Sequence, residues 1–495
     1  MTTATTAPHD DRLSKQDLAI IATLIVATFV VILNETVMSV ALPVLQRDLG
    51  ADPTQGQWLT TIFMLTMAVV IPVTGFLIQR FGTRTMYLAA MSLFVLGTLT
   101  ALLAPGFAVL LVARVVQALG TAIMLPLLMT TVMTLVPENR RGAMMGNISV
   151  VIAVAPALGP TLSGLILDHW HWRAIFGVVL PIAVAALVIG ALFVQPVGDR
   201  TSEQIDYVSL PMAVLGFGGF VYGLVAIGEA ASGSAGMPVW IPFVIGGIGL
   251  AGFVLRQLRL QRVDRALLDL RVFASSTFTL AIVLMVAAMA TMMGTFIVVP
   301  YFAQEVLALS PSATGLLMLP GGLLMGLASP LIGRIYDARG ARILVIPGTI
   351  LIASGVWILT LVNSGTSAWL LAAAQTVLCI GLAATFTPLM TVSLSSLTPR
   401  LYAHGSAVLG TLQQVAGAAG TALFITIMTV VATSDQEAGV VAHEAVTNGV
   451  RTVFLCAGVL GLVLIGLGLL VRTPETVDEP EEADGAEPEP VGAVD

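Results

Sequence analysis

Fourteen long apolar segments follow one another along this chain, and each is long enough to cross a lipid bilayer. A membrane-spanning helix needs about 20 mostly apolar residues. The segments lie at 18–43, 58–79, 85–104, 107–133, 143–167, 173–194, 207–228, 239–256, 276–303, 312–335, 342–362, 367–390, 405–431 and 452–471. Most links between them are short, and the longer ones lie at 195–206, 257–275 and 432–451. The sequence therefore predicts an all-α integral membrane protein with fourteen spans.

The composition excludes a soluble globule. Only 10% of the residues are charged, 57% are hydrophobic, and the mean hydropathy is +0.98, whereas soluble proteins carry about 25% charged residues. Both cysteines, Cys379 and Cys456, lie in apolar runs, so we interpret them as packing residues rather than a disulfide or a metal pair. The sequence contains no Walker loop, HExxH or CxxC motif. We expect no metal, no cofactor and no nucleic-acid partner.

The positive charges indicate how the chain is oriented. Lys and Arg gather in cytoplasmic loops of membrane proteins. If the N-terminus is cytoplasmic, 17 of the 21 Lys and Arg residues fall in inside loops, and Arg47, Arg173 and Arg451 fall outside. Arg114 lies within a span. An even number of spans then places both termini in the cytoplasm, and the predicted location is the plasma or inner membrane.

Tryptophans mark the opposite ends of the spans. The five concerned are Trp58, Trp170, Trp172, Trp240 and Trp369. Amphipathic rings are enriched where a membrane meets water, so this distribution predicts an outer interfacial belt.

A loop sequence occurs twice, 258 residues apart. The first copy reads Gly75-Phe-Leu-Ile-Gln-Arg-Phe-Gly-Thr-Arg84, and the second reads Gly333-Arg-Ile-Tyr-Asp-Ala-Arg-Gly-Ala-Arg342. Each copy lies between the second and third spans of a six-span block. Parallel six-helix repeats build the major facilitator fold. The sequence therefore predicts two six-helix halves with two inserted helices between them.

The predicted organisation has five parts. Residues 1–17 form an N-terminal cytoplasmic tail, 18–194 the first half, 195–275 a linker with the two additional spans, and 276–471 the second half. Residues 472–495 are rich in Pro, Glu and Ala and contain no Lys or Arg after Arg472, a composition typical of disorder.

Several motifs make the resemblance to one family specific. The first span ends Leu33-Asn34-Glu35-Thr36, followed by Ala41-Leu42-Pro43, and the fourth contains Arg114, Gln117 and Gly120. The fifth span carries Gly146, Ala155, Gly159, Pro160 and Gly164, and a stretch beginning His404-Gly405-Ser406 leads to Gln413 and Gln414. From about 18 to 471, the sequence resembles the fourteen-helix drug:proton antiporters of the major facilitator superfamily, and in particular their lincomycin-exporter-like subgroup.

The resemblance implies roles for these residues. It implies that the fifth-span residues form the antiporter motif and that the repeated loops act as cytoplasmic gates. The gating residues are Gly75, Arg80, Gly82 and Arg84 in the first copy, and Gly333, Asp337, Arg339, Gly340 and Arg342 in the second. Gln79 replaces the usual acid of the first loop, which weakens a gating role for that position.

Glu35 and Arg114 are the clearest charges inside the predicted spans. Such charges are costly and are candidates for function. At ~1.5 Å per residue, Glu35, Arg114 and Gly159 lie ~10–14 Å from the outer ends of their spans, so we expect them in one layer. A low-dielectric cavity favours a neutral carboxyl group, and a nearby guanidinium favours the ionised form. We predict that Glu35, Arg114 and Gln117 couple transport to protons; a structural ion pair, or charges that reach toward the membrane surface, is the alternative.

Substrate contacts are harder to assign from sequence. Candidates for the substrate cavity are Asn34, Met38, Met124, Met289, Gln413 and Gln414. Methionine suits loose hydrophobic recognition, but ordinary packing explains each of these residues too.

The function expected is export of amphipathic small molecules, driven by the proton gradient through alternating access. Its partners would be the lipid bilayer, those small molecules and protons. One alternative is a transporter of the same fold for a single metabolite, such as a sugar, an amino acid derivative or a siderophore. A membrane enzyme would need acidic or histidine clusters at a membrane face, and the repeat disfavours a channel.

Overall fold

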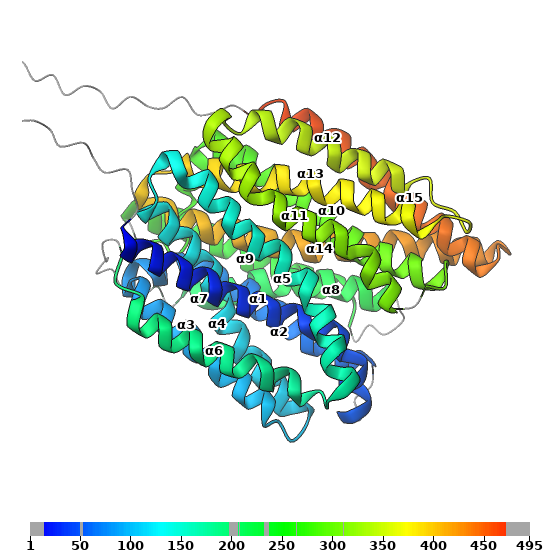
Figure 1. Ribbon diagram of the computed structural model, residues 1–495, viewed down its shortest axis with the longest axis horizontal. Helices are drawn as coiled ribbons and strands as arrows, with labels where there is room; N and C mark the ends of the chain where they lie inside the picture. Colours follow the sequence, from blue (N-terminus) through cyan, green and yellow to red (C-terminus); the bar gives the residue numbers. More distant parts are fainter. Residues whose placement is uncertain are drawn as a thin grey trace, which may run out of the picture.

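The computed structural model describes residues 14–49, 53–197, 206, 208–231, 237–263, 265–309 and 311–471. Helices make up nearly all of these residues, and no strand occurs among them. An α-helix satisfies its backbone hydrogen bonds within one segment, which a chain surrounded by lipid requires. The helices lie side by side along the long axis of the molecule (Figure 1).

In the described part of the chain, each half contains six α-helices. The first half consists of α1 (Lys15–Leu49), α2 (Pro53–Phe81), α3 (Thr83–Leu102), α4 (Phe107–Leu135), α5 (Arg141–His169) and α6 (Arg173–Phe193). The second half consists of α10 (Ser276–Glu305), α11 (Pro311–Arg339), α12 (Arg342–Leu359), α13 (Ala368–Ser395), α14 (Tyr402–Glu437) and α15 (Ala442–Gly468).

Two further helical segments lie between the halves in the sequence. The first consists of α7 (Ser209–Ala213), a π-helical turn η2 (Val214–Gly218) and α8 (Gly219–Ala231). The second is α9 (Trp240–Leu260), followed by the short helices η3 (Gln261–Val263) and η4 (Leu270–Ala274). We call α7, η2, α8 and α9 the inserted pair.

Twelve helices in the described part of the chain are long and apolar enough to cross a membrane. The predicted spans 143–167 and 207–228 are not among them. The first is nevertheless a continuous 29-residue helix, α5, whereas the second is interrupted by its π-turn and leaves only a shorter apolar stretch, Ser209–Leu224. The count of fourteen spans therefore remains a prediction.

The two halves meet along two equivalent seams. The fifth helix of the first half, α5, packs against the second helix of the other half, α11. In return the fifth helix of the second half, α14, packs against α2. The inserted pair breaks this symmetry, because α8 packs against α14 and α2 and so covers only one of the two seams.

The helices α1 and α15 place both ends of the described chain on the same side of the bundle (Figure 1). We call this the termini side and the other the far side. The predicted long link 432–451 is wrong, because α14 extends to Glu437 and α15 begins at Ala442. Hydropathy marks where an apolar span ends, but a helix continues into polar sequence wherever its backbone remains bonded.

The outside of the bundle is apolar. Leu192, Ile248, Leu316 and Leu327 are each at least 70% exposed. A soluble monomer rarely exposes large apolar patches, so this surface fits contact with lipid. Among the predicted belt residues, Trp172 is an exception: it is fully buried beside Phe176, because its ring fills the core of the first half rather than its edge.

Candidate functional site

The two copies of the repeated loop have the same backbone conformation. Gly82 and Gly340 each have φ of 77°, a left-handed conformation that favours glycine. Their N–H groups donate to the carbonyls four residues earlier, Ile78 at 2.8 Å and Tyr336 at 2.7 Å. Both glycines therefore end a helix in the same way and turn the chain sharply into the next one.

The other residues predicted to act in gating lie around these turns. Arg84 donates to the Ala191 carbonyl of α6 at 2.9 Å, which ties the first loop to its own half. Arg80 is half-buried, and Arg339 and Arg342 are exposed on the termini side. The first loop is thus anchored to α6, while two arginines of the second loop are exposed.

Gly75 and Gly333 lie where the halves touch. A Cβ atom built on Gly75 would overlap the backbone of Ala403 in α14, and one on Gly333 would overlap the backbone of Gly142 in α5. Such close approach of two helices requires small residues. Both contacts are on the termini side, where the structure is therefore closed.

Asp337 bridges the α5–α11 seam. Its carboxylate accepts hydrogen bonds from the backbone N–H groups of Gly142 and Ala143, each 2.7 Å long. These groups belong to the first turn of α5, where unpaired N–H groups and the helix dipole favour an anion. The second loop therefore acts as an electrostatic clamp on the other half.

Gln79 occupies the matching position of the first loop. Its side-chain amide donates to the Arg400 carbonyl just before α14 at 2.7 Å. The substitution that weakened the expected gating role thus still crosses the seam. It does so with a neutral bond to a carbonyl, without a carboxylate on helix N–H groups.

Arg114 lies deep in the first half, almost fully buried in α4. Its Nε donates to the Leu59 carbonyl of α2 at 3.2 Å, and Nη1 donates to Gln117 Oε1 at 3.1 Å. The guanidinium lies 4.0 Å from the centre of the Phe63 ring, a cation–π contact. Gln117 in turn donates to Thr98 Oγ1 of α3 at 3.0 Å. Arg114 and Gln117 therefore form a buried hydrogen-bonded network across α2, α3 and α4.

Glu35 brings the second half into this network. It is partly buried in α1 and interacts electrostatically with Arg114. The Gln414 side chain of α14 is its hydrogen-bonding neighbour, and Gln414 Nε2 also lies 3.7 Å from Met67 Sδ of α2. A carboxyl group in this position meets residues from both halves of the molecule.

The fifth-span motif has two contact faces. A Cβ on Gly146 would overlap Ser329 and Pro330 of α11, while one on Gly159 would overlap Thr36 of α1. Thr36 Oγ1 also lies 3.4 Å from the Ala155 carbonyl. Gly159 therefore lies beside the neighbour of Glu35, as the depth argument expected. The surroundings of Pro160 and Gly164 fall outside the described residues.

The proposed cavity residues do not form one group. Met38 and Met124 are fully buried in two separate core clusters, positions that packing explains. Met289 is partly buried near Gly417, and Gln413 is partly buried in α14.

Asn34 differs from these residues. It is 1% exposed, and neither of its amide atoms has a hydrogen-bond partner among the described residues. Leaving such a group unpaired costs about 1–3 kcal/mol. An unpaired amide next to Glu35 suits a site that binds water or a ligand.

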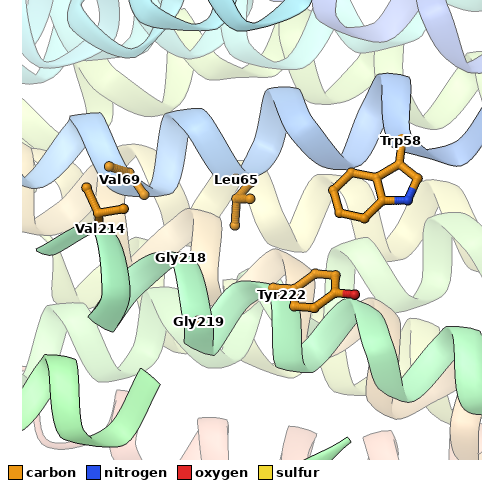
Figure 2. A pocket seen from close by; sticks show the side chains of 7 residues that line it. All are labelled: Trp58, Leu65, Val69, Val214, Gly218, Gly219 and Tyr222. Atoms are coloured by element: carbon orange, nitrogen blue, oxygen red, sulfur yellow. The ribbon is translucent and has the colours of Figure 1, made fainter. Parts of the chain in front are cut away.

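A shallow apolar groove of about 280 Å³ lies between α2 and the inserted pair (Figure 2). Its lining residues are Trp58, Leu65, Val69, Val214, Gly218, Gly219 and Tyr222. Trp58 and Tyr222 lie at one end with ring centres 5.8 Å apart. No group of three or more His, Cys, Asp or Glu side chains in the described part of the chain could hold a metal ion.

Sequence reasoning missed one buried polar cluster on the termini side. Gln257 is fully buried, and its side chain accepts from Leu267 N at 2.8 Å and donates to Ser209 Oγ at 2.8 Å. Nearby, Asp206 forms a bidentate ion pair with Arg256. The only signal in the sequence was a glutamine among arginines at the end of a span.

Comparison with known proteins gives consistent matches. A sequence model of the Major Facilitator Superfamily matches residues 24–421. Lincomycin resistance protein LmrB of Listeria monocytogenes is 41% identical over 456 residues, covering 91% of this chain and 95% of that protein. LmrB of Bacillus subtilis is 37% identical over 460 residues, covering 92% and 95%.

Two matches at lower sequence identity include a curated relative and a solved structure. A multidrug resistance protein B homologue of Mycobacterium tuberculosis is 30% identical over 423 residues, covering 85% of this chain and 78% of that protein. Among solved structures, the human organic anion transporter MFSD10 (TETRAN) superposes with a TM-score of 0.63 at 15% identity, covering 90% of this chain and 99% of that one. This last likeness shows that the fold is shared.

Proposed function

Because this chain belongs to the major facilitator superfamily, we propose that it exports amphipathic small molecules across the cell membrane in exchange for protons. Membership of a transporter superfamily removes the membrane-enzyme alternative. Relatives named for lincomycin and multidrug resistance support a drug substrate, and lincomycin is the first compound to test.

The observation that carries this proposal is the position of Glu35. The carboxyl group lies between the buried Arg114 network of the first half and Gln414 of the second. A change in the distance between the halves would alter its surroundings, and with them its affinity for a proton. Proton binding would thereby depend on which side of the transporter is open.

Alternating access supplies the transport step. The termini side is closed by the contacts of Gly75, Gly333 and Asp337. Rocking of the two halves about a site between them would open this side and close the other. The unpaired amide of Asn34 supports a polar contribution to that site.

The decisive experiment uses Glu35→Gln, which keeps the shape and hydrogen bonding of the side chain but cannot ionise. Drug efflux is measured in vesicles with an imposed pH gradient. We expect uphill export to be lost while binding of neutral compounds survives, and Glu35→Asp to keep partial function. Glu437→Gln, exposed at the end of α14, is the matched control and should export normally.

Uphill export by Glu35→Gln at near the parent rate would exclude Glu35 as the coupling site. Asp48, Asp168 and Glu305 would then be the next candidates. Of these, Asp48 lies 3.3 Å from His171 and Glu305 is exposed at the end of α10. Export of one metabolite, with no change in drug susceptibility, would favour the single-substrate alternative.

The proposed orientation places both termini in the cytoplasm, because the positive charges concentrate in loops on the termini side. A reporter enzyme fused after Val471 should be active only if it is cytoplasmic. A reporter exposed on the outside would mean that the number of crossings is odd.

A further inference from the structure

The two seams between the halves are closed by different chemistry. At the α5–α11 seam, the Asp337 carboxylate binds the first turn of α5 through two backbone N–H groups. At the α2–α14 seam the matching residue is Gln79, which binds one carbonyl. Hydrogen bonds to an ionised group are about twice as strong as neutral ones. The α2–α14 seam therefore lacks a charged hydrogen bond like the one that Asp337 makes at the α5–α11 seam.

The residue that corresponds to Ala143 on the weaker seam is His404. Gly333 faces the backbone of Gly142 and Ala143 in α5, and Gly75 faces the backbone of Ala403 and His404 in α14 in the same way. A side chain with two hydrogen-bonding nitrogens thus replaces a methyl group at the start of α14.

His404 does not point into water. It is 6% exposed, and its Nδ1 accepts from the backbone N–H of Asp269 at 3.4 Å. The Leu267 backbone is a further hydrogen-bonding neighbour of the ring. The Asp269 carboxylate is itself occupied by Arg271, with a shortest N–O distance of 2.6 Å. The group that reaches the imidazole is therefore main chain from residues 265–274, which we call the connector.

The connector contacts the first half, the inserted pair and the second half. Leu267 is fully buried against Val73 and Phe76 of α2. Its N–H and that of Leu268 donate to Gln257 Oε1 of α9 at 2.8 and 3.3 Å. With His404 of α14, the connector joins the first half, the inserted pair and the second half at a single point on the termini side.

We propose that the connector is a latch that holds the α2–α14 seam closed, with His404 as its positioning residue. The connector lies at the seam that has no carboxylate bound to a helix N-terminus. The inserted pair then has a definite role: through Gln257 it holds the connector in the conformation that His404 binds. This inference rests on the proposed alternating access of the two halves.

The test measures the gate directly, apart from drug export. Spin labels are placed on exposed positions across each seam, at 81 and 398 for α2–α14 and at 139 and 339 for α5–α11, after replacing the free cysteines Cys379 and Cys456. Distances between the labels are measured by pulsed electron paramagnetic resonance on the full chain in lipid nanodiscs. The variants are His404→Phe, which removes the acceptor, and His404→Asn, whose amide oxygen can take the place of Nδ1.

Loss of the Asp269–His404 hydrogen bond alone should lower the ratio of closed to open molecules by roughly 5-fold, and loss of the Leu267 contact as well should not make the effect smaller. We expect His404→Phe to shift both distance pairs toward the open values, because the halves move as rigid bodies. His404→Asn should restore the parent distribution. His404→Ala introduces the residue found at the equivalent position of the other seam, Ala143, and adds no bulk. It should behave like His404→Phe. His443→Phe, on an exposed histidine of α15, should change nothing.

Two results would overturn the latch. One is a parent-like distribution in His404→Phe and His404→Ala. The other is broadening of the 81–398 distance alone, which would mean local packing. Asp337→Asn separates this inference from the proposed function. If neither that variant nor a pH gradient with lincomycin moves any distance, alternating access itself fails; if they move both pairs and His404→Phe moves neither, only the latch fails.

Discussion

Gly142 donates its backbone N–H to Asp337 at 2.7 Å, and this bond joins the fifth helix of one half to the second helix of the other. Asparagine at 337 could accept only one of the two hydrogen bonds and would carry no charge for the helix dipole. A hydrogen bond to a charged group contributes about 1.5–3 kcal/mol. Asp337→Asn should therefore slow export at least ~10-fold in the vesicle assay. An unchanged rate would show that the clamp does not limit the cycle.

Gly159 provides a test of the α1–α5 contact. A Cβ there already overlaps Thr36, so Gly159→Leu should abolish export while membrane-inserted protein remains near the parent level. Gly247→Leu is the matched control, because a Cβ on Gly247 meets nothing within 4 Å. Drug susceptibility and membrane immunoblots measure the two quantities. Normal export by Gly159→Leu would mean that this helix approach is not needed.

Arg114→Lys tests whether the buried network needs a guanidinium. Lysine keeps the charge, but it cannot bond Leu59 and Gln117 in the same fork or stack on Phe63. We expect uphill export to fall at least ~10-fold, since two charged hydrogen bonds are disturbed. Arg140→Lys, on an exposed arginine, should export normally. Equal rates for both variants would reduce Arg114 to a generic positive charge.

The inserted pair should lie outside the transport path. In this structure it covers the α2–α14 seam from the side, and its groove with α2 is apolar. Single cysteines at Val214 and Tyr222, which line that groove, give the sharpest test in a cysteine-free background. Saturating lincomycin should leave their labelling by a thiol reagent unchanged. Strong protection at both positions would place substrate in the groove.

Asp206 anchors the inserted pair outside the spans, and its pKa is informative. Hydrogen bonds from Arg256 and Ser209 lower the pKa of this carboxyl to about 2, from 3.8. A lowered pKa means that the ionised group contributes its full stability above the unfolded pKa and loses it as the pH falls through about 2. Asp206→Asn should thus lower Tm by the same amount at every pH between about 5 and 8. A difference that grows or shrinks across this window would contradict the assignment.

Local sequence patterns determined much of this protein. Apolar length located the helices, because a backbone in lipid must satisfy its own hydrogen bonds. The paired loops at Gly75 and Gly333 predicted two equivalent halves, and Gly82 and Gly340 share the same φ because the same turn requires the same glycine. Depth counted along a rigid helix was sufficient to bring Gly159 to the level of Glu35.

Tertiary structure alone decided what crosses between the halves. Asp337 meets α5 from 195 residues away, and Gln79 meets Arg400 from 321; no local periodicity encodes such a pairing. In sequence, His404 was part of a family-like stretch, and Gln257 was one polar residue among several. Their roles come from packing, since a hydrogen-bonding side chain becomes decisive only when burial removes water as its alternative partner. The sequence could predict which helices form, while the contacts between their faces determined where the gates lie.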